Sequence, residues 1–330
     1  MSKKYELTGI GNAIVDVISQ GTDEFLQALE IQKGGMTLID QMRAQKIYNS
    51  MGPGTETSGG SAANTMAGFA SLGGKGAYMG KVADDQLGRI FAHDMKSVGI
   101  DFPTAPLRHG PETASCLIIV TPDGERSMNT FLGACVEFGE TDIDEKTIQE
   151  SQVVYLEGYL FDKDTAKSAY RKATKLATAA GAKTALSLSD AFCVERHRAD
   201  FQALVKNEID ILFANENEIM ALYQSKTFDE AVAAVRGACS IAALTRADKG
   251  CVIITKDTID TVPAAPIAKL VDTTGAGDQF AAGFLFGLAR GKSMVECAEI
   301  ASLAAGEVIS HVGPRPSISL ADLIRDKRAA

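Results

Sequence analysis

A chain of 330 residues with 45% hydrophobic and 23% charged residues is long enough for one large α/β domain or two smaller ones. Its net charge of −9 gives no indication of a nucleic-acid partner or of an anionic membrane. The N-terminus lacks the apolar core of a signal peptide, and no apolar run reaches the length of a membrane span. We therefore expect a cytoplasmic protein with neither nucleic acid nor membrane as partner.

The first 54 residues predict short strands and one helix. Residues 5–18 predict strand, tight turn and strand, and Asp16 lies inside the apolar run 14–18. Its carboxylate is either on an exposed strand face or directed at a ligand hydroxyl, and the sequence slightly favours exposure. Another strand is expected at 36–39, followed by a helix at 40–50 that ends in the breaker Gly52-Pro53-Gly54.

A glycine pair precedes the next predicted helix. Gly59 and Gly60 are followed by Ser61, a good N-cap residue, and by a helix of small residues through Leu72. The two glycines allow the main chain to approach a polyhydroxy ligand closely, and Asn64 faces the same way one turn into the helix. A plain strand–turn–helix corner is the alternative, and it is the better explanation of this motif taken alone.

The middle of the chain predicts a hairpin. A strand at 75–82 and a helix at 84–98 come first. Asp123-Gly124 then separates two β-rich runs at 113–120 and 126–132, which is a strong hairpin signal. Together with the strands near 14–19 and 34–39, this hairpin is expected to form a small β layer outside the main sheet.

From residue 152 onward strands alternate with helices, which predicts parallel βαβ units. The expected strands are 153–156, 183–188, 209–213, 241–244, 252–255 and 267–271, with helices near 164–180, 193–206, 216–223 and 228–237. Ligands of such a sheet bind at the carboxyl ends of its strands. Polar residues at those ends are Glu157, Ser189, Asp190, the run 215–218, Thr245, Arg246 and the run 272–278.

Two of these strand ends carry groups suited to phosphate chemistry. Carboxylates in the run 215–218 could hold Mg²⁺ directly or through water, although acids at a helix N-terminus are common and a little better supported by the motif alone. Arg246 either meets a phosphate or is solvated.

The run 271–285 predicts a strand end, a Gly-rich turn and a buried helix. Gly275 and Gly277 let backbone N–H groups approach a ligand, and the helix adds its own free N–H groups and positive dipole end. Such a place binds phosphate, so Asp278 makes chemical sense there as a general base for a hydroxyl. The alternative is that Asp278 merely caps the helix. The hydroxyls and carboxylate of 272–274 and the small, apolar helix behind them favour the site.

Several nucleotide-binding and catalytic motifs are missing. GxxxxGK[ST], the protein-kinase motifs and GxSxG do not occur, and Ile14 stands where a dinucleotide fingerprint needs a small residue.

The motifs together resemble the ribokinase (PfkB) family of carbohydrate and nucleoside kinases. DTTGAGDQFAAGFL at 272–285 and GGSAANTMAGFASLG at 59–73 resemble its two signatures, and GKVADDQLGR follows the second. ANENE at 214–218 resembles the NxxE motif, and TRADKG at 245–250 resembles a TxGxxG loop with Ala247 where glycine is usual. The resemblance implies one ribokinase-like domain over residues 1–330. Its expected fold is a three-layer α/β/α sandwich with a mostly parallel central sheet and a small β-sheet lid from about 12–57 and 105–135.

The resemblance also implies roles for individual residues. Asp278 matches the catalytic base, with Gly275, Ala276 and Gly277 as the anion hole. The implied substrate contacts are Asp16, Gly59, Gly60 and Asn64; the implied ATP contacts are Asn215, Thr245, Arg246, Gly250, Thr273, Gly275 and Gly277; the implied metal ligands are Asn215 and Glu218. ATP with Mg²⁺ is the expected phosphate donor. A K⁺ effect is implied through carbonyls around Asp272 and 302–313.

The acceptor is expected to be adenosine or a related nucleoside, phosphorylated on its primary 5′-hydroxyl, as in purine salvage. The runs 186–219 and 153–160 look closer to adenosine kinases than to ribokinases. Phe131 and Tyr159 could form an apolar slot for a base, or could equally be lid core. Glu157 argues the other way, because a sugar kinase could use this carboxylate on a hydroxyl. A free sugar such as ribose or fructose is therefore the alternative, and a non-catalytic nucleoside or sugar sensor is a third possibility that Asp278 disfavours. The chain is expected to be a monomer or a homodimer.

Overall fold

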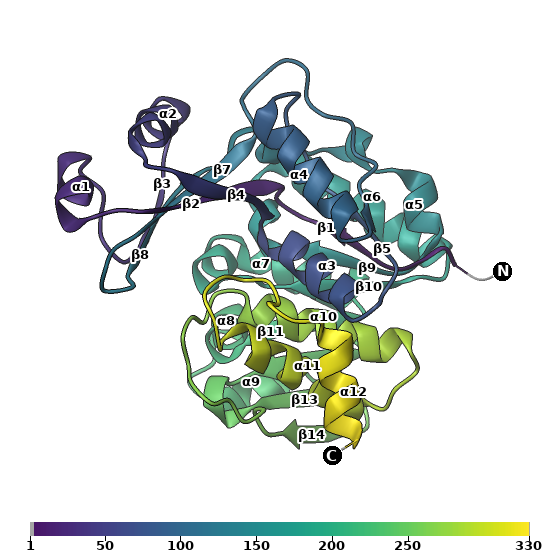
Figure 1. Cartoon of the computed structure of the whole chain (residues 1–330). Helices are drawn as coiled ribbons and strands as arrows, with labels where there is room; N and C mark the ends of the chain where they lie inside the picture. Colours follow the sequence, from purple (N-terminus) through teal and green to yellow (C-terminus); the bar gives the residue numbers. More distant parts are fainter. Residues whose placement is uncertain (1–2, 330) are drawn as a thin grey trace.

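A computed structural model describes residues 3–329 of the chain (Figure 1), and within them the strands form two sheets. The strands of the larger sheet are β1 (Tyr5–Ile10), β5 (Gly76–Met79), β6 (Ile100–Asp101), β9 (Ser151–Glu157), β10 (Lys183–Ser187), β11 (Ile211–Asn215), β12 (Ile241–Thr245), β13 (Cys251–Thr255) and β14 (Ile259–Val262). Their spatial order is β14-β13-β12-β11-β10-β9-β1-β5-β6. The predicted α/β fold with a mostly parallel main sheet is confirmed.

The main sheet is antiparallel only at the edge formed by β13 and β14. The connections there are too short for a crossover helix, so each strand folds back on its neighbour. The strand expected at 267–271 is wrong. β14 takes the edge position instead, and residues 263–275 form an irregular segment in which Ile267, Leu270 and Val271 are exposed. The apolar residues that predicted a buried strand at 267–271 lie in a loop.

Helices cover both faces of the main sheet because its strands are apolar at successive positions. One layer contains α3 (Ser61–Ser71), α4 (Gln86–Ser97), α10 (Ala276–Ala289) and α11 (Met294–Val308), and α12 (Leu320–Ala329) packs beside α3 and α11. The other contains α5 (Glu145–Gln149), α6 (Asp164–Ala179), α7 (Ala191–Glu208), α8 (Glu216–Tyr223) and α9 (Phe228–Val235). Short 3₁₀ turns are η1 (Gly133–Glu137), η2 (Glu140–Asp142), η3 (Gly158–Asp162) and η4 (Ala247–Lys249).

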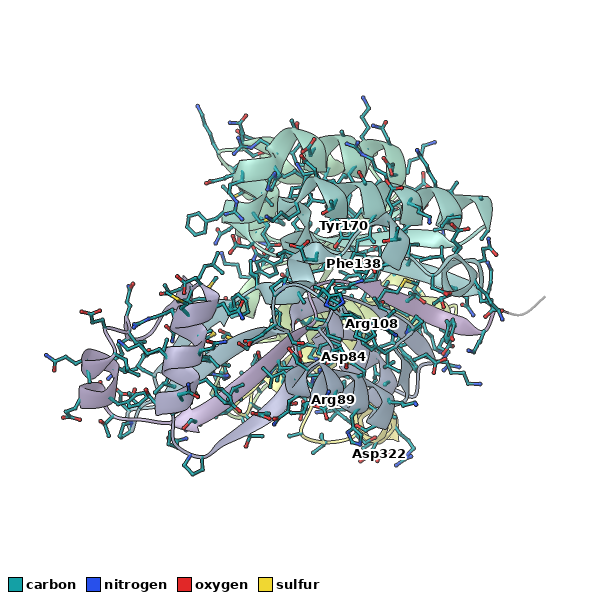
Figure 2. The ribbon with its side chains drawn as sticks, turned by 90° about the horizontal axis from the view of Figure 1, so that it is seen from above. Asp84, Arg89, Arg108, Phe138, Tyr170 and Asp322 are labelled. Carbon is teal, nitrogen blue, oxygen red and sulfur yellow. The ribbon has the colours of Figure 1, made fainter. Side chains whose placement is uncertain are left out.

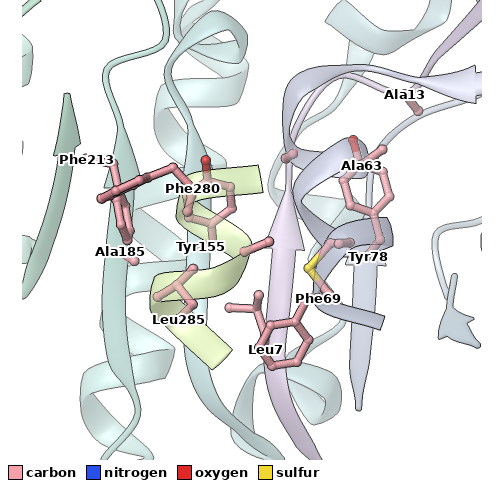
Figure 3. Packing of buried hydrophobic residues seen from close by; sticks show 14 of the residues in the cluster. Leu7, Ala13, Ala63, Phe69, Tyr78, Tyr155, Ala185, Phe213, Phe280 and Leu285 are labelled. Atoms are coloured by element: carbon pink, nitrogen blue, oxygen red, sulfur yellow. The ribbon is translucent and has the colours of Figure 1, made fainter. Parts of the chain in front are cut away.

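Alternate side chains of each strand separate into two cores. In β9, Val153 and Tyr155 join the cluster under α3 and α10, whereas Val154 and Leu156 join the cluster under α6 and α7. Figure 3 shows part of the first cluster, in which Phe280 of α10 lies next to Phe213 and Tyr155 of the strands. This packing fixes the N-termini of α3 and α10 next to each other. Within residues 3–329, every helix is too short or too polar to cross a bilayer.

The smaller sheet, called the lid below, projects from one side of the main body (Figures 1 and 2). Its strands are β2 (Ile14–Gln20), β3 (Met36–Leu38), β4 (Gly54–Gly59), β7 (Ala114–Val120) and β8 (Arg126–Phe131), in the order β3-β8-β7-β2-β4. β7 and β8 form the hairpin predicted from Asp123-Gly124. Two helices, α1 (Asp23–Ala28) and α2 (Gln41–Ser50), accompany the lid, and α1 was not expected from the sequence.

The topology places a ligand site at the junction of β1 and β9. The chain builds β1, β5 and β6 toward one edge and β9 to β12 toward the other, so the order reverses between β1 and β9. Ligands of open α/β sheets bind at the carboxyl ends of the strands at such a reversal. Asn12 and Glu157 lie at these two carboxyl ends.

Candidate active site

A cleft of about 1450 Å³ lies where the carboxyl edge of the main sheet meets the lid. A pocket for one small ligand usually measures about 300–1,000 Å³, so this volume suits two ligands side by side. The lid contributes Ile14, Asp16, Met36, Leu38, Cys116, Ile118, Arg126, Met128 and Thr130 to its wall, and the main body contributes the strand ends and the N-terminus of α10.

Asp278 lies at the bottom of this cleft as the third residue of α10. Its Oδ1 accepts a hydrogen bond from Ser61 Oγ at 2.6 Å, and its Oδ2 accepts one from Asn64 Nδ2 at 3.5 Å. The N-cap of α10 is Gly275, whose φ of +81° suits glycine and whose Cβ position is blocked by Pro314. Asp278 therefore points across to α3 rather than capping its own helix.

Ser61 has a different place from the one expected. The N-cap of α3 is Gly60, with φ of +92°, and Ser61 is the first helical residue. The prediction that Ser61 caps the helix is wrong because a side chain at Gly60 would collide with the Asn12 carbonyl oxygen at 2.2 Å. The glycine cap leaves the Ser61 hydroxyl free to donate to Asp278.

The amides at the start of α10 are directed toward the cleft. The Ala276 N–H donates to the Thr273 carbonyl oxygen, whereas the Gly277 and Asp278 N–H groups donate to no other group among residues 3–329. A Cβ on Gly277 would meet nothing within 4 Å. Free amides at a helix N-terminus with open space before them are suited to binding an anion.

Burial raises the pKa of Asp278 to about 7. The hydrogen bonds from Ser61 and Asn64 and the charge of Arg315 oppose this rise, whereas the charge of Asp16 adds to it. A carboxylate with a pKa near neutrality is suited to act as a general base because it is available deprotonated and binds a proton well.

Asp16 and Gly59 form one unit at the base of the lid. The slight preference for an exposed Asp16 is wrong, since this side chain is half-buried and lines the cleft. A Cβ on Gly59 would lie 2.4 Å from Asp16 Oδ2, so only glycine leaves room for this carboxylate. Burial raises the pKa of Asp16 to about 6, against the charges of Arg315 and Arg126.

Glu157 lines the cleft, but its carboxylate is occupied by the protein. The residue is 1% exposed. Its Oε1 accepts from the backbone N and from Nδ2 of Asn12, and its Oε2 accepts from the Ala62 N–H at 2.8 Å. These bonds tie the end of β1 to the start of α3. Asn12 Oδ1 is buried and has no hydrogen-bond partner among residues 3–329. Asn12 lines the cleft, and sequence reasoning missed it as a site residue although it lies in the turn between two predicted strands.

Asn215 and Glu218 form a capping box at the start of α8. Asn215 Oδ1 accepts from the Glu218 N–H at 2.9 Å, and the Glu218 carboxylate accepts from the Asn215 N–H and from Nδ2. Burial raises the pKa of Glu218 to about 7. Residues 3–329 contain no cluster of three or more His, Cys, Asp or Glu groups that could hold a metal alone. A Mg²⁺ ion at this end of the cleft would have to keep water and phosphate oxygens as most of its ligands, because both Glu218 carboxylate oxygens and Asn215 Oδ1 already accept hydrogen bonds.

The predicted nucleotide-side loop meets the cleft through Thr245, Ala247 and Gly250, but not through Arg246. The Arg246 guanidinium instead pairs with Glu216 at 3.0 Å and lies 4.1 Å from the centre of the Phe228 ring. Its side chain is 26% exposed and is absent from the cleft wall, so the structure brings Arg246 to Glu216 and Phe228 rather than to the cleft.

Of the two aromatic residues predicted for a base slot, Tyr159 lines the cleft and Phe131 does not. Phe131 packs against the hydrophobic core, in agreement with the alternative that it is lid core. Tyr159 is 43% exposed, and Phe192, which also lines the cleft, is 71% exposed. On the lid, Met36 and Leu38 are exposed by more than half. Phe192, Met36 and Leu38 were missed because nothing in their local sequence indicates an apolar wall.

A second apolar area lies on the other side of α10. It consists of the segment 264–270 and one face of α11, with Ala264, Ala265, Ile267, Leu270, Ser302, Ala305, Gly306 and Ile309 on the cleft wall. A Cβ on Gly306 would approach Ile267 and Ala265 to 3.3 and 3.4 Å, so this glycine lets the segment lie close to the helix. The cleft thus has two apolar ends with Asp278 and the free amides between them.

An ion pair connects the lid to the turn before α10. Arg126 of β8 pairs with Asp272 at 2.5 Å, and both side chains are close to 90% buried. Asp272 also accepts from the Gly313 N–H and from the N–H and hydroxyl of Thr274. The predicted contact residue Thr273 follows Asp272 directly and lines the cleft.

Comparison with known proteins gives a consistent result. The model of the family described as "pfkB family carbohydrate kinase" matches residues 35–320. A crystal structure of a probable sugar kinase from Rhizobium etli CFN 42 shares 46% identity with a TM-score of 0.91, covering 99% of this chain and 100% of that one. The crystal structure of adenosine kinase from Sinorhizobium meliloti shares 50% identity with a TM-score of 0.89 and the same coverage. An ATP-dependent ribose-1-phosphate kinase from Halopiger xanaduensis is 30% identical over 70% of this chain and 73% of its own.

Proposed function

This chain belongs to the pfkB family of carbohydrate kinases, and on that premise we propose that it transfers the γ-phosphoryl group of ATP to the 5′-hydroxyl of a nucleoside, with adenosine the best-supported acceptor. Kinases of this family are phosphotransferases that act on hydroxyl groups of sugars or nucleosides. The observation that carries the proposal is the position of Asp278, beside unpartnered helix amides and between two apolar ends of one cleft.

In this proposal the protein's groups divide the transfer step between them. Asp278 takes the proton of the acceptor hydroxyl while the acceptor oxygen bonds to the γ-phosphorus and the bond to the leaving oxygen of ADP breaks. Ser61 and Asn64 hold the Asp278 carboxylate in place. The Gly277 and Asp278 amides face the transferred group and stabilise its charge. Mg²⁺, when bound with ATP near Asn215 and Glu218, neutralises phosphate charge.

The two apolar ends support two different occupants. The segment 264–270 with α11 lies beside Thr245 and Gly250 and suits the adenine of ATP. The wall of Met36, Leu38, Tyr159 and Phe192 lies on the side of Asp16 and suits a second flat, apolar base. A free sugar would leave this second wall exposed to water, which favours a nucleoside as the acceptor. The lid, which contributes Met36 and Leu38 to this wall, would exclude water from the transfer.

The adenosine proposal also draws on the Sinorhizobium meliloti adenosine kinase, which shares 50% sequence identity with this chain. A sugar acceptor is the second candidate, supported by the probable sugar kinase of Rhizobium etli and by the polar groups Asp16 and Asn12 Oδ1 on the cleft wall.

The test is ADP release from ATP and Mg²⁺ with adenosine, inosine, 2′-deoxyadenosine, ribose, fructose and ribose 1-phosphate as separate acceptors. Turnover with adenosine to give the 5′-monophosphate supports the proposal. Turnover restricted to sugars moves the assignment to the second candidate, and tight binding without ADP release would indicate a sensor. Repeating the assay with choline chloride in place of KCl tests the further proposal that carbonyls around Asp272 and 302–313 bind K⁺.

The variant Asp278→Asn tests the role of the base. We expect kcat to fall by about 10²–10⁴-fold, or roughly 3–5 kcal/mol of barrier, because the amide cannot accept the proton. Asp229→Asn is the matched control, since Asp229 also lies in the first turn of a helix but is exposed. An Asp278→Asn enzyme whose kcat equals that of the control would contradict the proposal.

A further inference from the structure

Arg315 lies behind the cleft wall in the loop that follows α11, and it faces the carboxylates of the site. Its Nε donates to Asn64 Oδ1 at 3.1 Å. Its charge acts on Asp16 at the lid base, on Asp94 of α4 and on Asp278. Nη2 of the same guanidinium is buried and has no hydrogen-bond partner among residues 3–329. Pro314, the preceding residue, forms part of the cleft wall.

The loop that carries Arg315 is fastened to both helices of the site. Gln279, fully buried in α10, donates from Nε2 to the Asn64 and Pro314 carbonyl oxygens, both at 3.0 Å. Pro314 also packs where a Cβ of Gly275 would stand. Arg315 therefore has a defined position relative to α3 and to the start of α10.

The chemistry of the guanidinium determines how the Asn64 amide is oriented. A guanidinium has only donors, whereas an amide side chain has an acceptor oxygen and a donor nitrogen. Because Arg315 Nε donates a hydrogen bond to Asn64 Oδ1, Asn64 Nδ2 must point to the other side, where Asp278 Oδ2 lies 3.5 Å away. The reversed amide would place its oxygen against a carboxylate.

We propose that Arg315 is a positioning residue for phosphoryl transfer: it orients the Asn64 amide toward Asp278 and supplies a buried positive charge among the carboxylates of the cleft. The inference rests on the proposed function, because it concerns the base of that reaction. Arg315 acts through Asn64 and through its charge and does not touch the substrate.

The charge has a consequence for pH dependence. The charged groups that act on Asp278 are Arg315, which lowers its pKa, and Asp16, which raises it, while Glu157 and Glu218 face it from β9 and α8. Removing the guanidinium therefore raises the pKa of Asp278. Since the base works deprotonated, the acidic limb of kcat/KM must move to higher pH.

The experiment measures kcat and KM between pH 5.5 and 9 for the wild type, Arg315→Met, Arg315→Lys and the control Arg290→Met. Arg290 also pairs with a carboxylate and lies over an aromatic ring, but on the far side of the protein at the end of α10. We expect Arg315→Met to shift the acidic limb upward by about one pH unit and to lower kcat at pH 7 by about tenfold, with the KM for ATP little changed. Arg315→Lys keeps the charge, so its limb stays near that of the wild type while its kcat falls.

The Asn64→Ala background separates positioning from simple damage. If Arg315 acts through Asn64, Arg315→Met costs clearly less in kcat in Asn64→Ala than in the wild type. A limb that does not move in Arg315→Met, or losses that multiply independently in the double variant, would overturn the inference. Should Arg315→Met not fold, an Arg315→Lys enzyme with full wild-type kcat would overturn it as well.

A failure of the proposed function remains distinguishable from a failure of this inference. The Asp278 carboxyl carbon can be titrated by ¹³C NMR in wild type and Arg315→Met, with Asp278→Asn to assign the signal. A higher pKa in Arg315→Met supports the inference even if no alcohol is phosphorylated, and an unchanged pKa refutes it.

Discussion

Ala247 holds a backbone conformation that L-residues adopt only at a cost. Its φ is +50°, at the start of the turn η4 between β12 and β13. The left-handed region brings Cβ close to the following carbonyl oxygen, which costs roughly 1–2 kcal/mol. Glycine is free of this clash but loses about 0.5–1 kcal/mol more in chain entropy on folding. Glycine is therefore the usual residue at this position of such a loop because it avoids the clash of Cβ with the carbonyl oxygen.

We expect Ala247→Gly to stabilise the protein by about 0.5–1 kcal/mol, the relief of strain less the entropy lost by glycine. Urea unfolding with an unchanged m-value measures this. Ala234→Gly is the matched control, because Ala234 is exposed within α9 and should cost about 1 kcal/mol. Equal destabilisation by both substitutions would show that Ala247 is not strained.

Single residues also mark where sequence reasoning is strong. The turn glycines at 60 and 275 could be predicted because the requirement for a positive φ is local. The hydrogen bond between Arg315 and Asn64 could not, since 251 residues separate them and no motif surrounds Arg315. The preference of the sequence for an exposed Asp16 is wrong because an alternating strand does not reveal which of its faces borders a cleft.

At the scale of elements, the hairpin of β7 and β8 and the helix α10 follow directly from their own residues. The segment 263–275 does not, because apolar residues on a cleft wall and apolar residues in a buried strand give the same local pattern. The apolar walls of the cleft likewise depend on bringing the lid, the start of α7 and one face of α11 together. Such an arrangement arises from tertiary packing.

The lid is held to the body by the pair of Arg126 and Asp272, and we expect Arg126→Met to loosen it. Asp272 would remain buried without its counter-charge, which is costly in a site of this kind. The expected result is about a tenfold fall in kcat/KM for the acceptor and faster hydrogen exchange in β7 and β8. Steady-state kinetics and hydrogen-exchange mass spectrometry measure the two effects.

Lys33→Met is the matched control for this prediction. Lys33 pairs with Asp23 and Asp123, so both of its partners belong to the lid and no contact to the body is lost. We expect little change in kcat/KM and in the exchange of β8. Identical exchange in the two variants would show that the Arg126 pair does not restrain the lid.

At the scale of the whole molecule, the cleft concentrates carboxyl groups that burial keeps from ionising easily. Burial raises the pKa of Asp16 to about 6 and those of Glu157, Glu218 and Asp278 to about 7. The four groups come from β2, β9, α8 and α10, so folding itself brings them together. The ligand-free protein therefore carries electrostatic stress that a bound cation or a transferred proton would relieve.

This stress predicts the sign of a stability change with pH. A carboxyl group with a higher pKa in the folded than in the unfolded chain binds more protons when folded, so stability falls as pH rises from about 4 to 7. We expect the Tm of the ligand-free wild type to be at least about 3 °C lower at pH 8 than at pH 5.5. The raised pKa of Asp278 alone corresponds to roughly 2 kcal/mol over this interval, and an unfolding entropy of about 2.1 cal/mol/K per residue makes 1 kcal/mol worth about 1.4 °C in a chain of this length. Asp278→Asn, which cannot ionise, should show a smaller difference in Tm between the two pH values and a higher Tm than the wild type at pH 8.

Asp123→Asn is the control, because the bond from Lys33 lowers the pKa of Asp123 and its titration lies below this range. Scanning calorimetry at the two pH values measures these differences in Tm. An equal pH dependence in Asp278→Asn and the wild type would mean that Asp278 is already ionised at pH 5.5. Its burial would then be too slight to make it a base tuned to neutral pH.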